Sequence, residues 1–205
     1  KNLKVQLENV KVLSAKTIEQ EKEKQRILEG QKEKLEKMVD ERTKELADEK
    51  EKTEQLLLNT LPLKVVNDLK TNGKTEPESF EDVTVYFSDI VGFTKISSQL
   101  EPAELIHELN VIFTAFDDIM ERNHCERIKT IGDAYLAVCG MPERNPDHAW
   151  HMSKAALEIR EYLKKRNTGS EIEWNIRIGL LSGKVVGGVV GVKKYIYDVF
   201  GDTIN

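Results

Sequence analysis

The chain has 205 residues, a net charge of −5 and a pI of about 5.6, so binding to nucleic acid through a general basic surface is not expected. Its two cysteines form no CxxC motif, which argues against a disulfide framework and indicates a reducing compartment. No run of about 18 apolar residues is present, so the sequence predicts no membrane-spanning helix.

The first 60 residues predict one long helix. Lys, Glu and Gln dominate this stretch, which has no proline or aromatic residue, and at 60 residues it would extend about 90 Å. Apolar residues recur at alternating heptad positions a and d, namely at Ile18, Leu28, Leu35, Val39, Leu46 and Leu56. The pattern favours a parallel dimeric coiled coil, and a solvated spacer helix is the alternative.

The heptad pattern is irregular in two ways. Arg42 and Glu49 occupy positions where apolar d residues belong. The N-terminal apolar set fits only after a shift of register, and it consists of Leu3, Leu7 and Val10 together with Ser14. Polar seam positions and register shifts permit alternative pairings of the two helices.

A junction and then a globular domain follow the helix. Pro62 interrupts the helix, and Val65, Val66 and Leu69 predict a short second helix that ends near Gly73. We therefore assign residues 1–60 to the coiled coil, 61–79 to the junction and 80–205 to the domain.

The pattern of the domain predicts an α+β fold. The predicted elements are a strand at 83–87, a helix at 102–120, a hairpin around Gly132-Asp133, a helix at 147–165, a strand in "EWNIRIGLLSG", the glycine-rich "KVVGGVVGVKK", and "YIYDVFGDTIN". The order β-α-β-β-α-β is the ferredoxin-like arrangement, in which the helices cover one face of an antiparallel sheet.

Two acidic residues are candidates for metal chemistry. Asp89 ends the first strand of the domain, and Asp133 lies in the hairpin that is expected to flank that strand. Two adjacent carboxylates repel one another unless they share a proton or bind a cation. Their hard oxygen atoms suit Mg²⁺ or Mn²⁺, and two such ions can assist phosphoryl transfer. The alternative is that Asp133 is only a turn residue.

The turn after Asp89 is a candidate phosphate site. The chain leaves the strand through Gly92, and a helix start is expected directly afterwards. Main-chain N–H groups at such a turn can bind a triphosphate.

Four motifs resemble those of class III nucleotidyl cyclases. They are "VTVYFSDIVGFT", "RIKTIGDAYLAVCG", "IRIGLLSGKVVGGVVG" and "YDVFGDTIN", in the order of that family and from Val83 to Asn205. The preceding "LLNTLPLKVVNDL" resembles the segment that joins a signalling helix to such a domain. The resemblance implies a head-to-tail homodimer with active sites at the interface. It also implies ring closure by attack of the ribose 3′ oxygen on the α-phosphorus, which releases pyrophosphate.

The resemblance also implies a role for individual residues. Asp89 and Asp133 would bind two Mg²⁺ or Mn²⁺ ions per site, and the carbonyl of Ile90 would be a further ligand. Asn205 would orient the ribose in the transition state. The main chain would contact the phosphates at Ile90, Val91, Gly92, Phe93 and Thr94.

Lys129 and Asp198 match the two positions that read the purine in this family. A lysine can donate to adenine N1 and an aspartate can accept from the adenine amino group, so we expect an adenylyl cyclase that converts ATP to cyclic AMP. The alternatives are a guanylyl cyclase, whose family members typically carry Glu and Cys here, and a non-catalytic nucleotide-sensing dimerisation module. A diguanylate cyclase is disfavoured because its characteristic hairpin motif is replaced by "IGDAY".

The chain departs from the family pattern at two points. Leu181 stands where many members have a histidine. The arginine expected four residues after Asn205 lies beyond the chain, so we expect a domain that is incomplete at its C-terminus, which raises the prospect of an inactive isolated chain. We expect a cytoplasmic protein that is driven by an upstream sensor, and the parent can be anchored in a membrane through an upstream domain.

Overall fold

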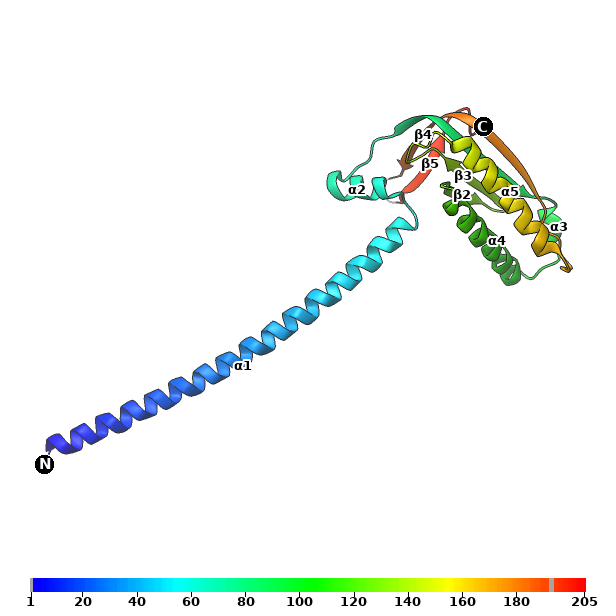
Figure 1. Cartoon of the computed structure of the whole chain (residues 1–205). Helices are drawn as coiled ribbons and strands as arrows, with labels where there is room; N and C mark the ends of the chain where they lie inside the picture. The colour runs from blue at the N-terminus through cyan, green and yellow to red at the C-terminus, as the bar shows by residue number, and fades with distance from the viewer. Residues whose placement is uncertain (1, 192–193) are drawn as a thin grey trace. The chain divides into compact units, whose positions relative to one another are not determined.

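The computed structural model describes residues 2–191 and 194–205, and the side chains of residues 2–10 and 12 are outside this description. The chain divides into two compact units, residues 1–57 and residues 58–205 (Figure 1).

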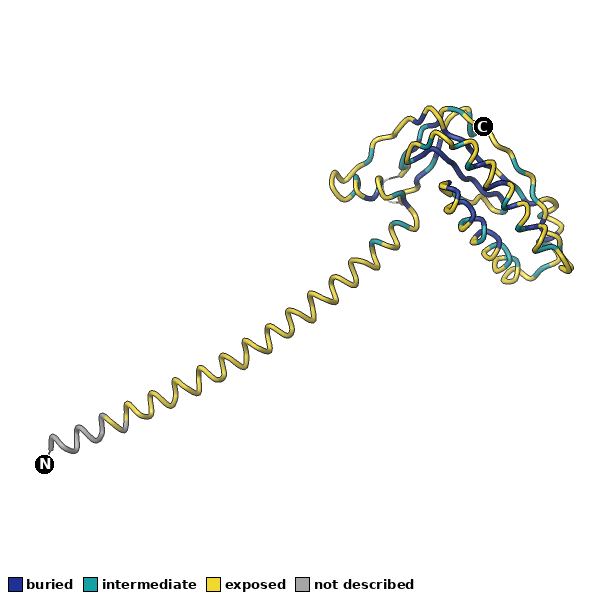
Figure 2. The backbone as a smooth tube through the Cα atoms, viewed as in Figure 1, coloured by how far each residue is buried: buried dark blue, intermediate teal, exposed yellow. Residues whose placement is uncertain are grey.

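Helix α1 forms nearly all of the first unit and runs from Asn2 to Leu58, which confirms the prediction of one long helix. Its apolar seam is uncovered in the single chain, because its described length has the exposed colour except for intermediate residues near its C-terminal end (Figure 2). Leu28 is 61% exposed, Leu35 58% and Leu46 65%. The side chains of the N-terminal set Leu3, Leu7 and Val10 lie outside the described residues.

The second unit begins with a short helix, α2 (Leu63–Asn72), which confirms the prediction for this segment. Pro62 precedes it, and Gly73 ends it in the left-handed conformation (φ 69°), with its N–H donated to the carbonyl of Leu69. Val66 is the buried residue of this helix, and it packs into the core of the domain.

The domain contains a five-stranded antiparallel sheet in the order β2-β3-β1-β4-β5. The strands are β1 (Glu78–Ile90), β2 (Glu126–Ile131), β3 (Ala134–Cys139), β4 (Ile176–Val190) and β5 (Ile196–Phe200). The helices that follow α2 are α3 (Phe93–Ser97), α4 (Pro102–Arg122) and α5 (His148–Asn167). The domain therefore combines helices with an antiparallel sheet, and β1 lies at the centre of this sheet.

The two faces of the sheet bury separate apolar clusters. Alternation along β1 directs Tyr86 and Ile90 toward the cluster that α4 and α5 cover, and Val83 and Val85 toward the opposite face. On the opposite face, Val66 of α2 and residues of β4 and β5 complete the second cluster. The central strand is thus held from both sides, which fixes the position of its C-terminal end.

Two strands are longer than the sequence predicts. β1 begins at Glu78, and a register irregularity between Phe80 and Val83 breaks the alternation that marks a strand. β4 continues through the glycine-rich stretch up to Val190, and residues 192–193 of that stretch lie outside the described residues. An added Cβ atom at Gly187 would lie 2.5 Å from the hydroxyl oxygen of Tyr197, so a larger residue there would displace that side chain.

Candidate active site

The end of strand β1 and the β2–β3 turn bring Asp89 and Asp133 together, as the sequence predicts. β1 pairs with β3 up to Ser88 opposite Tyr135, so the turn that precedes Tyr135 lies beside Asp89. The carboxyl groups of Asp89 and Asp133 are hydrogen-bonded to each other, and the N–H of Ile90 donates to both. The site therefore consists of two side chains from adjacent elements and one main-chain donor between them.

Arg177 is the partner of Asp89 that the sequence analysis missed. It lies directly opposite Asp89 in the β1–β4 register, and its guanidinium donates to the Asp89 carboxylate. This hydrogen bond is the main reason why the pKa of Asp89 lies below its ordinary value, and the bond to Asp133 adds to the effect. Burial and then the hydrogen bond with Asp89 raise the pKa of Asp133. The pair thus favours one ionised and one protonated carboxyl.

The acid pair fits a divalent cation that keeps much of its own coordination shell. Among the described residues, no group of three or more His, Cys, Asp or Glu side chains could hold a metal ion. Two adjacent carboxylates are sufficient for Mg²⁺, which typically takes one or two protein carboxylates and completes its shell with water and substrate phosphates. Asp89 and Asp133 are therefore the residues that would hold such an ion.

The segment after Asp89 offers fewer main-chain donors than the sequence predicts. The N–H of Val91 is already donated to the carbonyl of Asn175 at 2.8 Å. Gly92 adopts a left-handed conformation (φ 71°), and α3 begins at the next residue, Phe93. Because the first N–H groups of a helix have no acceptor within it, Gly92, Phe93 and Thr94 stay as predicted phosphate contacts and Val91 does not supply an N–H.

Lys129 on β2 and Asp198 on β5 form an ion pair, although the two strands lie at opposite ends of the sheet order. The Lys129 Nζ atom lies 2.5 Å from Asp198 Oδ2, and Asp198 Oδ1 accepts the N–H of Val199 at 2.9 Å. The sheet therefore curls until its outer strands approach. In the described part of the chain no hydrogen bond joins this ion pair to Asp89 or Asp133, and Asn205 is exposed and belongs to neither pair.

A central acid pair on an antiparallel sheet and the four motifs in order define a nucleotide cyclase domain. The profile of the adenylate and guanylate cyclase catalytic domain matches residues 75–205, and the chain belongs to this family. The predicted resemblance to class III nucleotidyl cyclases is thereby confirmed.

Guanylyl cyclases are among the curated proteins and solved structures that the chain resembles. Mouse retinal guanylyl cyclase 2 is 46% identical over 183 residues, which are 88% of this chain and 16% of that protein, so the chain spans about one sixth of such relatives. The guanylate cyclase domain of RhGC from Catenaria anguillulae in complex with GTP is 43% identical, with a TM-score of 0.59 over 62% of this chain and 69% of that one. The catalytic core of a rhodopsin-guanylyl cyclase with converted specificity, in complex with ATPαS, is 45% identical, with a TM-score of 0.60 over 63% and 71%.

These relatives overturn the predicted adenylyl cyclase with ATP as substrate and cyclic AMP as product. The error lies in the polarity argument for Lys129 and Asp198. That argument fixed the lysine opposite purine N1 and the aspartate opposite the 6-substituent. The O6 and N1 atoms of guanine are neighbours, so a lysine can donate to O6 while an aspartate accepts from N1–H and the 2-amino group. The same adjacent donor and acceptor can therefore read guanine.

Proposed function

We propose that the domain is the output of a guanylyl cyclase that converts GTP to 3′,5′-cyclic GMP and pyrophosphate. The observation that carries the proposal is the contact between Asp89 and Asp133, in a domain whose relatives are guanylyl cyclases. Ring closure needs an activated ribose 3′ hydroxyl and a neutralised triphosphate, and an acid pair that binds cations serves both needs. The element order also supports our ferredoxin-like description of the domain.

Asp89 and Asp133 would hold Mg²⁺ or Mn²⁺, with two ions per site. When bound, the ions supply Lewis-acid activation of the 3′ hydroxyl and charge neutralisation at the phosphates. The protein's own residues hold both carboxylates in place. The N–H of Ile90 orients them, and Arg177 favours the ionised form of Asp89. Arg177 is 73% exposed at its side chain, so it is free to leave Asp89 when a cation arrives.

The purine would be read by Lys129 and Asp198, and Asn205 would orient the ribose. The side chain of Lys129 is 34% exposed and that of Asp198 is 17% exposed, so a base can replace water at this ion pair. Lys129 donates to guanine O6 and Asp198 accepts from N1–H and the 2-amino group. The neighbours with GTP and with ATPαS support the view that few side chains on this scaffold select the base.

Each active site would lie between two copies of the chain. Asp89 and Asp133 of one protomer would face Lys129, Asp198 and Asn205 of the other. Support comes from the single chain, in whose described part the acid pair and the Lys129–Asp198 pair are not bonded to each other. The exposed heptad seam of α1 supports a parallel coiled coil that aligns the copies and connects them to an upstream sensor in a longer, cytoplasmically exposed protein.

The substrate is tested with the parent protein that contains this chain. The protein is incubated with Mn²⁺ and equal concentrations of GTP and ATP, and mass spectrometry identifies the cyclic products. We expect cyclic GMP to predominate and the double variant Lys129→Ala/Asp198→Ala to lower kcat/KM for GTP by about 10- to 100-fold.

The control is another cross-strand ion pair, Lys184 with Glu81 at 2.7 Å, which lies between β4 and β1. The variant Lys184→Ala/Glu81→Ala is expected to keep the base preference. A wild-type protein that makes chiefly cyclic AMP would overturn GTP as the substrate, and one that makes neither product would overturn the enzymatic proposal.

A further inference from the structure

The two cysteines of the chain lie opposite each other at the base of the β2–β3 hairpin. The register pairs Glu126 with Val138, so one step outward along both strands places Cys125 opposite Cys139. Directly opposed residues of an antiparallel pair have Cβ atoms about 4.5–5.5 Å apart. A disulfide needs a Cβ separation of about 3.5–4.5 Å, so a small approach of the strands would allow the bond to form.

The two thiols already interact in the reduced protein. The mutual influence of the two thiols is the main cause that lowers the pKa of Cys139 and raises the pKa of Cys125. Cys139 Sγ lies 3.2 Å from the carbonyl oxygen of His124, and Cys125 Sγ lies 3.4 Å from that of Asn123. The two thiols thus donate to the carbonyl groups of successive residues, which agrees with their opposed positions in the register.

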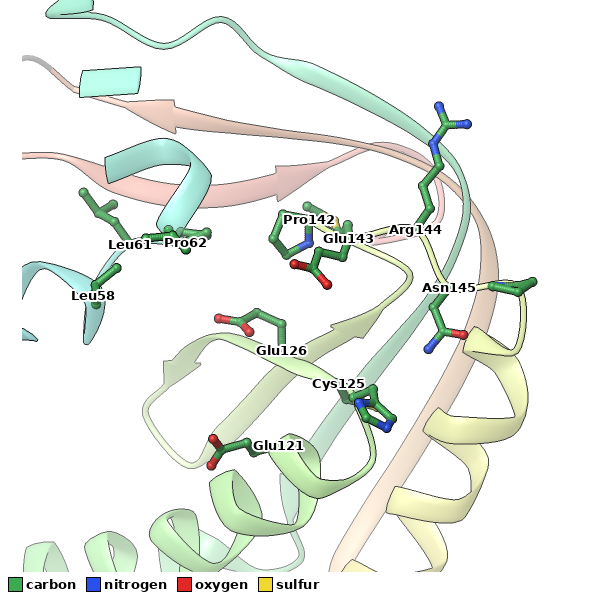
Figure 3. A pocket seen from close by; sticks show the side chains of 14 residues that line it. Leu58, Leu61, Pro62, Glu121, Cys125, Glu126, Pro142, Glu143, Arg144 and Asn145 are labelled. Atoms are coloured by element: carbon green, nitrogen blue, oxygen red, sulfur yellow. The ribbon is translucent and has the colours of Figure 1, made fainter. Parts of the chain in front are cut away.

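One of the two cysteines, Cys125, faces a pocket. Cys125 lines a cavity of about 540 Å³ between the segment at Leu58–Leu63, the end of α4 and the loop after β3 (Figure 3). Asn145 lines the same cavity, and its Nδ2 atom lies 3.8 Å from Cys139 Sγ. Cys139 is fully buried behind it and does not line the cavity. A small molecule can thus approach Cys125 first.

Ordinary packing does not explain this arrangement fully. A buried free cysteine usually behaves as a small apolar residue, and that description suits one cysteine among apolar neighbours. Here both cysteines of the chain are opposed across the two strands, and one of them lines a cavity. In a reducing compartment, a disulfide from such a pair is transient and serves to sense oxidants.

We propose that Cys125 and Cys139 are a redox-sensitive dithiol, which a low-molecular-weight disulfide such as oxidised glutathione converts to an intrachain disulfide through this cavity. Although Cys139 is the more acidic thiol, only Cys125 lines the cavity, so Cys125 attacks first. Its thiolate attacks one sulfur of the oxidant, which forms a mixed disulfide and releases one glutathione thiolate. The thiolate of Cys139 then attacks Cys125 Sγ and releases the second. The two protons lost by the cysteines appear on two molecules of reduced glutathione, and the oxidant takes up two electrons.

The bond would tie together elements that serve the active site. The hairpin that it closes carries Lys129 on β2 and Asp133 in the turn. The same cavity is lined by Leu61 and Pro62 of the junction that follows α1. Oxidation would therefore fix the hairpin base at the point where the junction meets the domain.

The test uses the reduced full chain and oxidised glutathione, with intact mass and thiol titration after unfolding as readouts. We expect loss of both thiols, a product lighter by two hydrogen atoms, and full reversal by dithiothreitol. A peptide that links Cys125 to Cys139 should appear after proteolysis. Persistent glutathione adducts, disulfide-linked dimers, or two unreacted thiols would each overturn the proposal. None of these readouts depends on cyclase activity.

The two single variants test the order of the steps. Cys139→Ser should accumulate the mixed disulfide at Cys125, because the resolving thiol is absent. Cys125→Ser should react at least about tenfold more slowly, because Cys139 is buried. The opposite pattern would overturn the assigned order, and the wild-type thiol titration stays decisive if either variant is poorly folded.

Discussion

Helices α1 and α4 both carry an apolar stripe, but only α4 has its stripe covered within the chain. Ile112 and Phe116 of α4 are 1% exposed, whereas Leu35 of α1 is 58% exposed and Leu46 is 65% exposed. Helix α4 contacts α5 and β2, and the described residues of the first unit provide no such neighbour for α1. Periodicity thus predicts that a face will be buried, and it does not say which molecule buries it.

The largest effect is expected from substitutions at the acid pair, which should abolish the chemistry of the domain and leave the association of α1 intact. Asp89→Asn and Asp133→Asn remove ligand charge with little change of volume, so each should lower cyclase turnover at least about a hundredfold. The dimer measured by analytical ultracentrifugation should be unchanged, because α1 is unaltered and each substitution keeps the volume of the side chain at the proposed interface between the domains.

Asp82→Asn is the matched control, since Asp82 is an exposed acid on the same strand. Its turnover should equal that of the wild type. Near-normal turnover of either site variant in Mg²⁺ would contradict the metal assignment.

An intermediate effect on cyclase activity is expected when two impaired variants are mixed, because each copy can supply the half of the site that the other lacks. Asp89→Asn and Lys129→Ala proteins should each be impaired, and an equal mixture should recover about a quarter of wild-type activity. Random exchange makes half of the dimers mixed, and each mixed dimer has one intact site of two. Mass spectrometry of isotope-labelled subunits verifies exchange, and exchange without recovery would show that the site lies within one chain.

The smallest effect concerns the coupling of α1 to the domain. Four residues inserted near Glu49 shift the heptad phase, whereas seven residues preserve it. We expect basal activity to change about threefold or more with four residues and less than about twofold with seven, since a bias of 1.4 kcal/mol changes a two-state ratio about tenfold. Equal responses in a cyclase assay would identify α1 as a passive tether.

The elements with strong local signals were predictable from the sequence. Pro62 and Gly73 mark the limits of α2, and the apolar spacing of α4 marks a buried face. The start of β1 was not predictable, because the exposed Glu81 and Asp82 interrupt alternation at an irregular register. β4 was underestimated because glycine disfavours strands in general, while here it permits a close approach to Tyr197.

The candidate site was predictable in part for a similar reason. Asp89 and Asp133 follow from the topology, since adjacent strands bring a strand end and a hairpin turn together. Arg177 does not, because its partner is set by the register between strands 88 residues apart in sequence. The base was predicted wrongly because donor and acceptor types do not fix which purine atom each side chain meets.

The Lys129–Asp198 pair has a consequence for how such a domain can evolve. The pair joins the two outer strands of the sheet, and both side chains are partly buried. A mutation at one position alone leaves the other charge without its partner, and this destabilises the fold. Substitutions at these two positions are therefore expected to arise together, or through a neutral residue first. With the base-reading role proposed above, a lineage that changes its nucleotide must cross a stability barrier as well as a chemical one.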